Sequence, residues 1–176
     1  MSRPPVLILH ATGTNRDREA AWAVELAGGK AEIVHVNALA AGTCHLLQYR
    51  MVVLPGGFSY GDDLGAGRLW ALDLRYRLAD QVREFTARGR PVLGICNGFQ
   101  ALVKAGLLPG GIEAKGPSAT LTRTASGRFE CRWIWLQPQT DGRCIFTEGL
   151  REMIYCPVAH GEGNFVPRDE AVLERL

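Results

Sequence analysis

Apolar runs and amphipathic stretches alternate over the first hundred residues of the chain. Four short, mostly apolar runs predict strands, at residues 6–10, 31–36, 50–54 and 91–95. Apolar side chains at helical spacing predict helices over residues 20–27 and 74–87, which Gly28 and Gly89 end. Buried strands that alternate with helices are typical of a parallel sheet covered on both faces. The fold class expected is therefore α/β, with a doubly wound, mostly parallel sheet.

The pattern changes after Gly110. Residues 120–124 and 129–135 alternate polar and apolar side chains, which predicts extra antiparallel strands after residue 118. A short helix is expected to begin within residues 167–170. The length of 176 residues suits one domain, so residues 1–176 are expected to form a single unit.

Charge and composition narrow the class of protein. Twenty Lys and Arg residues against 18 Asp and Glu residues leave a net charge of +2, which argues against nucleic-acid binding. No apolar run approaches the roughly 18 residues of a membrane span, and no signal peptide is evident, so we expect a cytoplasmic protein without a membrane partner. The five cysteines include no C-x-x-C pair, which disfavours disulfides and a metal site. Each cysteine is expected, by default, to be a small buried hydrophobic residue.

One cysteine lies in a setting that departs from this default. Residues 94–100 (GICNGFQ) directly follow a predicted strand and precede a helical stretch. The G-x-C-x-G pattern is the cysteine counterpart of the G-x-S-x-G nucleophile elbow, a sharp turn in which flanking side chains would clash with strand and helix. Cys96 would then lie at a helix N-terminus, where negative charge is stabilised. A buried cysteine in a tight strand-to-helix turn is the alternative for this motif alone.

A second motif favours the catalytic interpretation. Residues 54–59 (LPGGFS) end the preceding predicted strand, so they lie at the same carboxyl edge of the sheet as Cys96. A Gly-Gly turn at this edge can offer backbone N–H groups to a developing oxyanion, and the Asn97 N–H is the natural second donor. The two motifs together predict an acyl-transfer site.

These residues resemble class I (triad) glutamine amidotransferases and, among them, the family of glutaminase subunits of phosphoribosylformylglycinamidine synthases. The similarity covers the chain from Val6 to Leu176. It is carried by the two motifs above and by four further segments, at residues 13–17 (GTNRD), 57–63 (GFSYGDD), 126–132 (SGRFECR) and 159–163 (AHGEG). Arg16 stands where this family commonly has Cys.

The resemblance implies a reaction and a division of labour. A glutaminase of this kind hydrolyses L-glutamine through a γ-glutamyl thioester on Cys96, with the backbones of Gly57 and Asn97 as the oxyanion hole. The ammonia passes to a synthetase subunit, which uses ATP and magnesium to make formylglycinamidine ribonucleotide in purine synthesis. No cofactor or metal is expected in this chain. Four residues are implied as lining or flanking the glutamine pocket, namely Phe58, Gln100, Ser126 and Phe129.

The resemblance also marks a departure. A thiol nucleophile needs a base and an orienting carboxylate, which this family carries in a C-terminal Pro-His-Pro-Glu motif that the chain lacks. His160 and Glu162 have the same spacing, but the family has them in addition to its catalytic pair, so they are not expected to be the base pair. The remaining histidines are expected to be structural, at His10, His35 and His45.

Three interpretations of the sequence therefore stay open. The first is a glutaminase subunit that lacks the family's C-terminal part. The second is a catalytically incomplete fragment, or a non-catalytic remnant that still docks on the synthetase. The third is a cysteine-elbow protein of the DJ-1/PfpI group, which is also doubly wound but which residues 57–63 and 126–132 disfavour.

Overall fold

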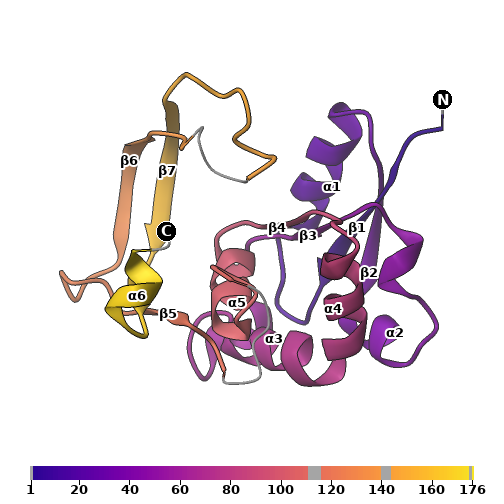
Figure 1. Cartoon of the computed structure of the whole chain (residues 1–176), viewed down its shortest axis with the longest axis horizontal. Coiled ribbons are helices and arrows are strands. Elements are labelled where there is room, and N and C mark those ends of the chain that lie inside the picture. Colours follow the sequence, from indigo (N-terminus) through magenta and orange to yellow (C-terminus); the bar gives the residue numbers. More distant parts are fainter. Residues whose placement is uncertain (1, 111–115, 140–143, 175) are drawn as a thin grey trace. The chain divides into compact units, whose positions relative to one another are not determined.

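The computed structural model of the chain describes residues 2–110, 116–139, 144–174 and 176 (Figure 1). These residues form two compact units. Unit 1 comprises residues 1–121 and 165–176, and unit 2 comprises residues 122–164. Unit 1 holds both motifs around Cys96, so it is described first.

A four-stranded sheet forms the centre of unit 1. Its strands are β1 (Pro5–His10), β2 (Lys30–His35), β3 (Met51–Leu54) and β4 (Val92–Gly94). All neighbouring strands are parallel and follow the order β2-β1-β3-β4. Leu54 is aligned with Gly94, so the two motifs begin side by side at the carboxyl edge. The doubly wound α/β fold expected from the sequence is confirmed.

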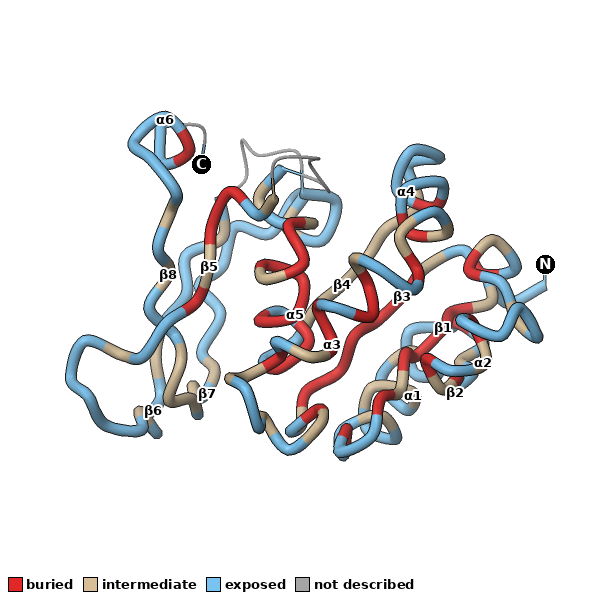
Figure 2. Tube along the Cα trace, turned by 90° about the horizontal axis from the view of Figure 1, so that it is seen from below, coloured by how far each residue is buried: buried red, intermediate tan, exposed pale blue. Residues whose placement is uncertain are grey.

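Helices cover both faces of this sheet (Figure 1). The covering helices are α1 (Asp17–Leu26), α2 (Val36–Ala40), α3 (Arg68–Leu72), α4 (Ala79–Ala87) and α5 (Asn97–Ala105). Unit 1 also contains the short helix α6 (Glu170–Leu173). Helix α1 packs through Ala20, Ala21 and Val24 on one face. Helices α2 to α5 contribute to a larger cluster on the other face. Figure 2 shows the buried residues gathered along β1, β3 and α5, so the strands next to the motifs run through the core.

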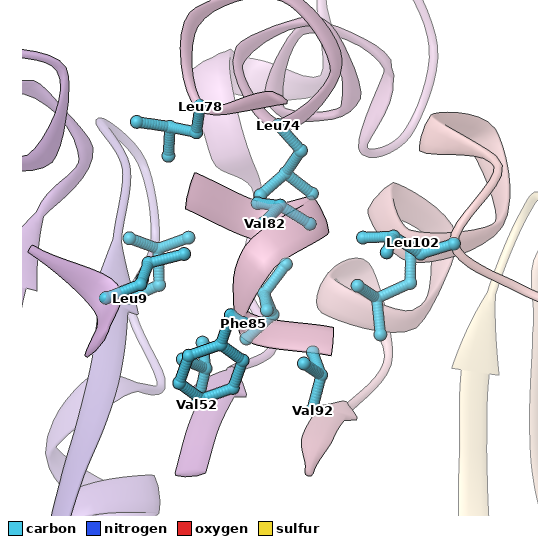
Figure 3. A pocket seen from close by; sticks show the side chains of 11 residues that line it. Leu9, Val52, Leu74, Leu78, Val82, Phe85, Val92 and Leu102 are labelled. Atoms are coloured by element: carbon cyan, nitrogen blue, oxygen red, sulfur yellow. The ribbon is translucent and has the colours of Figure 1, made fainter. Parts of the chain in front are cut away.

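The larger cluster encloses a small cavity of about 20 Å³ (Figure 3). Only apolar side chains line it, at Leu9, Leu46, Val52, Leu54, Leu74, Leu78, Val82, Phe85, Val92, Leu102 and Leu107. They come from three strands of the sheet and from the helical segments above it. Phe85 on α4 is 1% exposed and is the one aromatic residue of this lining. Packing here joins α4 and α5 to the sheet beneath Cys96.

The helix expected over residues 74–87 is wrong in its extent. A π-helical turn, η3 (Asp73–Arg77), continues α3, and Leu78 with φ −114° separates this turn from α4. Two short 3-10 turns, η1 (Leu46–Gln48) and η2 (Ser59–Asp62), flank β3. The apolar periodicity crosses the break because both segments pack on the same sheet face.

Unit 2 is built on an antiparallel pair, β6 (Glu130–Leu136) and β7 (Ile154–His160). β5 (Ala119–Thr122) and β8 (Asn164–Pro167) pair with each other, and all their residues except Thr122 and Asn164 belong to unit 1. The antiparallel pair β6 and β7 confirms the antiparallel strands expected after residue 118. The default of buried cysteines is wrong for all four cysteines outside the elbow, since Cys131 and Cys144 are exposed and Cys44 and Cys156 half-buried. Within the described residues, no helix is long and apolar enough to cross a membrane.

Replacing Phe85 by Ala tests whether this core holds unit 1 together. Removing a fully buried phenylalanine ring enlarges the cavity, so we expect Phe85→Ala to lower the free energy of unfolding by about 3–5 kcal/mol. Urea denaturation followed by circular dichroism measures this change. The exposed Arg83 on the same helix provides the control, and Arg83→Ala should change the free energy by less than about 0.5 kcal/mol. Equal effects of the two variants would contradict the assignment of this core.

Candidate active site

Cys96 occupies a strained turn between β4 and α5. Its backbone has φ 51° and ψ −110°, a combination that residues with a Cβ rarely adopt. Such strain costs about 1–3 kcal/mol and persists only where the surroundings impose it. The residue is exposed and directly precedes Asn97, the first residue of α5. The sulfur is therefore presented to solvent beside the first N–H groups of a helix, which have no acceptor within that helix.

The two glycines of the elbow allow the strand and the helix to pack closely. A Cβ on Gly98 would overlap the carbonyl group of Leu54 at the end of β3. A Cβ on Gly94 would lie 2.6 Å from Leu102 Cδ1 and 2.9 Å from the Gly98 carbonyl oxygen. The Leu54 carbonyl also accepts a hydrogen bond from the Ile95 N–H at 3.0 Å. The G-x-C-x-G spacing is thus required by the backbone approach, as the sequence predicted.

The Gly-Gly turn after β3 lies beside Cys96, the predicted nucleophile. A Cβ on Gly56 would come 3.4 Å from the Cβ of Cys96, so this peptide runs past the cysteine at contact distance. Gly57 has φ 135°, which favours glycine, and forms an isolated bridge with Thr14 of the loop after β1. The Phe58 N–H donates to the Gly13 carbonyl at 3.2 Å. Two loops at one edge of the sheet therefore hold the backbone of the predicted oxyanion donor Gly57.

The side chain of Asn97 lies beneath this turn and is 1% exposed as a residue. Its Oδ1 accepts a hydrogen bond from the Ser59 N–H at 3.1 Å. Its Nδ2 donates to Asp62 Oδ1 at 3.0 Å and to Gln100 Oε1 at 3.3 Å. Asp62 Oδ1 also accepts from the Gly67 N–H at 3.3 Å. The residue after Cys96 is therefore bonded to the loop that follows β3.

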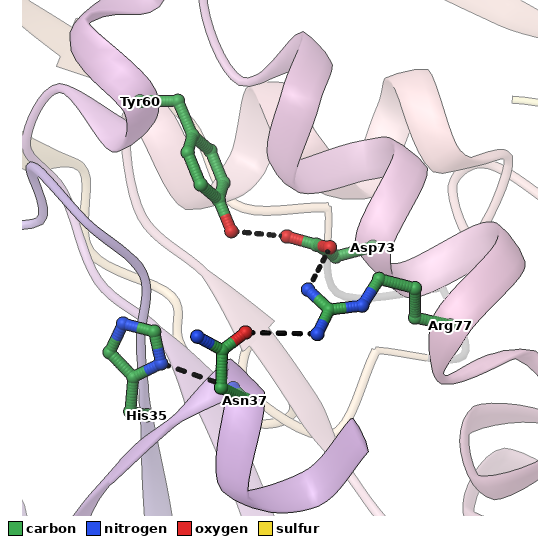
Figure 4. Close-up of polar contacts among 5 residues, drawn as sticks. All are labelled: His35, Asn37, Tyr60, Asp73 and Arg77. Carbon is green, nitrogen blue, oxygen red and sulfur yellow. Dashed lines mark hydrogen bonds and ion pairs between the residues drawn. The ribbon is translucent and has the colours of Figure 1, made fainter. Parts of the chain in front are cut away.

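A second set of polar contacts supports the same loop from its other side (Figure 4). Tyr60 has φ 55°, and its hydroxyl donates a short hydrogen bond to Asp73. Arg77 donates to Asp73 at 2.8 Å and to Asn37 Oδ1 at 2.9 Å, and His35 Nδ1 accepts from the Asn37 N–H at 3.1 Å. Burial, and then the hydrogen bond to Asp73, raise the pKa of the Tyr60 hydroxyl. Tyr60 therefore remains a neutral donor over the physiological pH range.

The predicted pocket residues fall into the two units. In unit 1, Phe58 is 58% exposed beside the Gly-Gly turn, whereas Gln100 is buried and meets Asn97. In unit 2, Phe129 lines a hollow of about 260 Å³ together with Arg123, Gly127, Arg128, Gly161 and Glu162. Ser126 is not among these lining residues. Its hydroxyl donates to Glu130 at 2.6 Å and is the main cause that lowers the pKa of that carboxyl, with Arg132 adding to it.

The partners of His160 and His10 bear on whether either imidazole ring is oriented by a carboxylate. His160 belongs to unit 2, its Nδ1 is buried, and among the described residues no group bonds to that atom. His10, expected to be structural, pairs through Nδ1 with Asp17 at 2.8 Å. It ends β1, which β3 separates from β4, so neighbouring-strand spacings put its backbone about 10 Å from that of the elbow strand.

Two features of this site go beyond the sequence prediction. The sequence predicts a role for the backbone N–H of Asn97 but none for its side chain. It predicts no individual role for Asp62, Tyr60 or Asp73. A signal was present in residues 60–63 (YGDD), because Gly and Asp tolerate left-handed backbone conformations. That signal indicates an unusual turn but does not identify its hydrogen-bond partners.

A cysteine elbow beside a Gly-Gly turn, at the carboxyl edge of a doubly wound sheet, fits a cysteine-dependent amidotransferase. The chain belongs to the CobB/CobQ-like glutamine amidotransferase domain family, whose profile matches residues 3–176. This match decides between the resemblances that the sequence left open, in favour of the glutamine amidotransferases.

Individual relatives give a narrower class. The chain is 50% identical to the phosphoribosylformylglycinamidine synthase subunit PurQ of Treponema denticola, over 99% of this chain and 68% of that protein. It is 47% identical to the same-named subunit of Dehalococcoides mccartyi, over 98% of this chain and 67% of that protein. The predicted resemblance to this family of glutaminase subunits is confirmed. The chain spans about two thirds of the length of these two relatives.

Solved structures agree with the sequence relatives. A chain in the structure of PurLQS from Thermotoga maritima superposes with a TM-score of 0.77 at 34% identity, over 96% of this chain and 71% of that chain. A glutamine amidotransferase from Thermotoga maritima matches with a TM-score of 0.56 at 20% identity, which shows the shared fold alone.

Adding one methyl group to the elbow tests its steric requirement. Gly98→Ala would force a Cβ into the Leu54 carbonyl, so we expect a loss of unfolding free energy of about 3 kcal/mol or more, or no folded protein. Gly110→Ala is the matched control, because no atom of the described residues lies within 4 Å of its Cβ position. Thermal and urea denaturation compare the two variants. A Gly98→Ala protein as stable as Gly110→Ala would contradict this geometry.

Proposed function

We propose that the chain is the glutaminase subunit of a phosphoribosylformylglycinamidine synthase and that Cys96 is its nucleophile. The observation that carries the proposal is the exposed, strained Cys96 at the start of α5, in contact with the Gly56–Gly57 turn. The names of the relatives in Treponema denticola and Dehalococcoides mccartyi supply the reaction in which the ammonia is used. Within this proposal, residues 3–176 act as part of one amidotransferase domain in the cytoplasm.

The geometry suits acyl transfer at an amide. The thiolate attacks the side-chain amide carbon of glutamine, and the negative charge moves to the carbonyl oxygen. The backbone N–H groups of Gly57 and Asn97 are the donors that stabilise this oxygen. Removal of one such donor typically lowers kcat by about 10²–10³-fold. Collapse of the intermediate breaks the C–N bond, and the nitrogen leaves as ammonia after taking a proton. Water then hydrolyses the thioester to glutamate and restores the thiol.

Candidate substrate contacts are named for each unit by itself in this proposal. Phe58 and Gln100 flank the nucleophile in unit 1. Phe129 in unit 2 lines a hollow with two arginines and Glu162, a charge pattern that suits the carboxylate and ammonium groups of a free amino acid. Ser126 supports the same segment through Glu130. L-Glutamine is accordingly the small-molecule substrate, and a synthetase subunit that uses ATP and magnesium is the partner that receives ammonia.

Covalent labelling tests the nucleophile directly. The glutamine analogue 6-diazo-5-oxonorleucine should form one thioether on Cys96, with the thiol proton passing to the diazo carbon and N₂ leaving. Peptide mass spectrometry locates the adduct among the five cysteines. Labelling should disappear in Cys96→Ala and persist in Cys131→Ala, another exposed cysteine. An intact chain that stays unlabelled, under conditions that label the Treponema denticola relative, would favour a non-catalytic docking role.

The role of His160 can be separated from that of Cys96. No described residue bonds to its buried Nδ1, so no described carboxylate orients the ring through that atom, as the carboxylate of a catalytic triad does. We therefore expect His160→Ala to label at a rate within about threefold of the parent chain, whereas loss of a general base costs 10²–10⁴. Circular dichroism provides the folding control. Abolished labelling in a folded His160→Ala protein would assign His160 as the base.

A further inference from the structure

The Asn97 side chain joins the start of α5 to the loop after β3, and each of these two elements carries one of the proposed oxyanion donors. Its own backbone begins α5, and its Oδ1 accepts from Ser59, two residues after Gly57. The residue is 1% exposed, so water cannot replace these bonds. A shift of the loop relative to the elbow would therefore leave the buried Ser59 N–H without an acceptor.

The bonds of Asn97 also fix the direction of its amide. Ser59 offers a backbone donor, so the atom facing it is the acceptor Oδ1, and Nδ2 faces Asp62 Oδ1 at 3.0 Å. The same Asp62 oxygen accepts from the Gly67 N–H at 3.3 Å, next to α3. Asp62 has φ 54°, so its carboxylate enters the network from a turn that few other residues adopt. The amide thus links the loop, the elbow and the start of α3.

We propose that the Asn97 side chain is a positioning residue for the oxyanion hole, which holds the Gly57 turn in register with the elbow. The inference rests on the glutaminase function proposed above. It assigns to the side chain a role that is separate from the backbone N–H of the same residue. Without the side chain, Cys96 keeps its exposed sulfur, whereas the two backbone donors lose their fixed separation.

Two reactions of the same thiol distinguish positioning from general damage. Labelling by 6-diazo-5-oxonorleucine places a ketone oxygen where the glutamine carbonyl oxygen binds, so it uses the oxyanion hole. Iodoacetamide alkylates the same sulfur by displacing iodide and develops no oxyanion. We expect Asn97→Ala to slow diazo-oxonorleucine labelling by about tenfold or more and to change iodoacetamide alkylation of Cys96 by less than about twofold. Parallel slowing of both reactions, or of neither, would overturn the proposal.

Gln81 supplies a matched control. Its side chain on α4 also bridges backbone groups, accepting from the Leu46 N–H at 3.1 Å and donating to the Leu39 carbonyl at 3.0 Å. Gln81→Ala should lower stability without changing the ratio of the two labelling rates. A ratio altered as strongly as in Asn97→Ala would show that lost stability alone accounts for the effect.

A reciprocal exchange tests the bonding itself. Asn97→Asp keeps an acceptor for Ser59 but faces the Asp62 carboxylate, so diazo-oxonorleucine labelling should be slow. Adding Asp62→Asn removes the carboxylate that faces position 97 and supplies an amide N–H that can donate to it, while the Gly67 N–H loses the oxygen that it shared at 3.3 Å. The double variant should therefore label at least about threefold faster than Asn97→Asp, because the repulsion between the two carboxylates is gone. A double variant no faster than Asn97→Asp would contradict the assigned network.

One measurement is independent of glutaminase activity. Amide hydrogen exchange of Ser59 should be at least about tenfold faster in Asn97→Ala, with exchange in β1 unchanged. If the parent chain is not labelled by diazo-oxonorleucine, the proposed function fails and this arm alone decides the positioning role. Unchanged Ser59 exchange in Asn97→Ala would overturn it.

Discussion

The contact of Gly98 with the carbonyl group of Leu54 is the constraint on which the site depends. It lets α5 begin directly against the end of β3, and the Ile95 N–H bonds the same carbonyl. With strand and helix this close, the residue between them must take the positive φ seen at Cys96. The strain at Cys96 is thus imposed by packing on both sides, and the core around Phe85 and Leu102 holds those sides in place.

The loop after β3 is held beside this elbow by individual hydrogen bonds and not by a strand or a long helix. Backbone bonds to the Gly13 region hold its start, the Asn97 amide holds Ser59, and Tyr60 reaches back to Asp73. Each anchor comes from a different element, namely the loop after β1, the start of α5 and the π-helical turn η3. A loop held from three directions can keep the left-handed backbone of Tyr60 and Asp62, and it can offer N–H groups in a fixed direction.

A feature could be predicted from the sequence where the residues that form it are close together along the chain. The sheet, the elbow and the Gly-Gly turn depend on local patterns, such as apolar runs and glycine spacing, and they could be predicted. The side-chain bonds of Asn97 join residues 38 and 35 positions away, and no periodicity records them. The break near Leu78 escaped prediction because the apolar face continues across it. The Phe129 hollow forms in a unit whose strands only indicated a hairpin.

Arg16 shows how such a site accommodates a departure from its family's pattern. It stands where the resembling family commonly has Cys, and its Cγ lies 3.8 Å from the Cβ position of Gly56. The guanidinium group pairs with Glu19 at 2.6 Å, and this hydrogen bond is the main cause that lowers the pKa of that exposed carboxyl. The aliphatic part of the side chain therefore covers the Gly-Gly turn, while the charge pairs with α1. Because the turn next to Cys96 is built from backbone groups, a change of side chain at position 16 leaves its N–H donors in place.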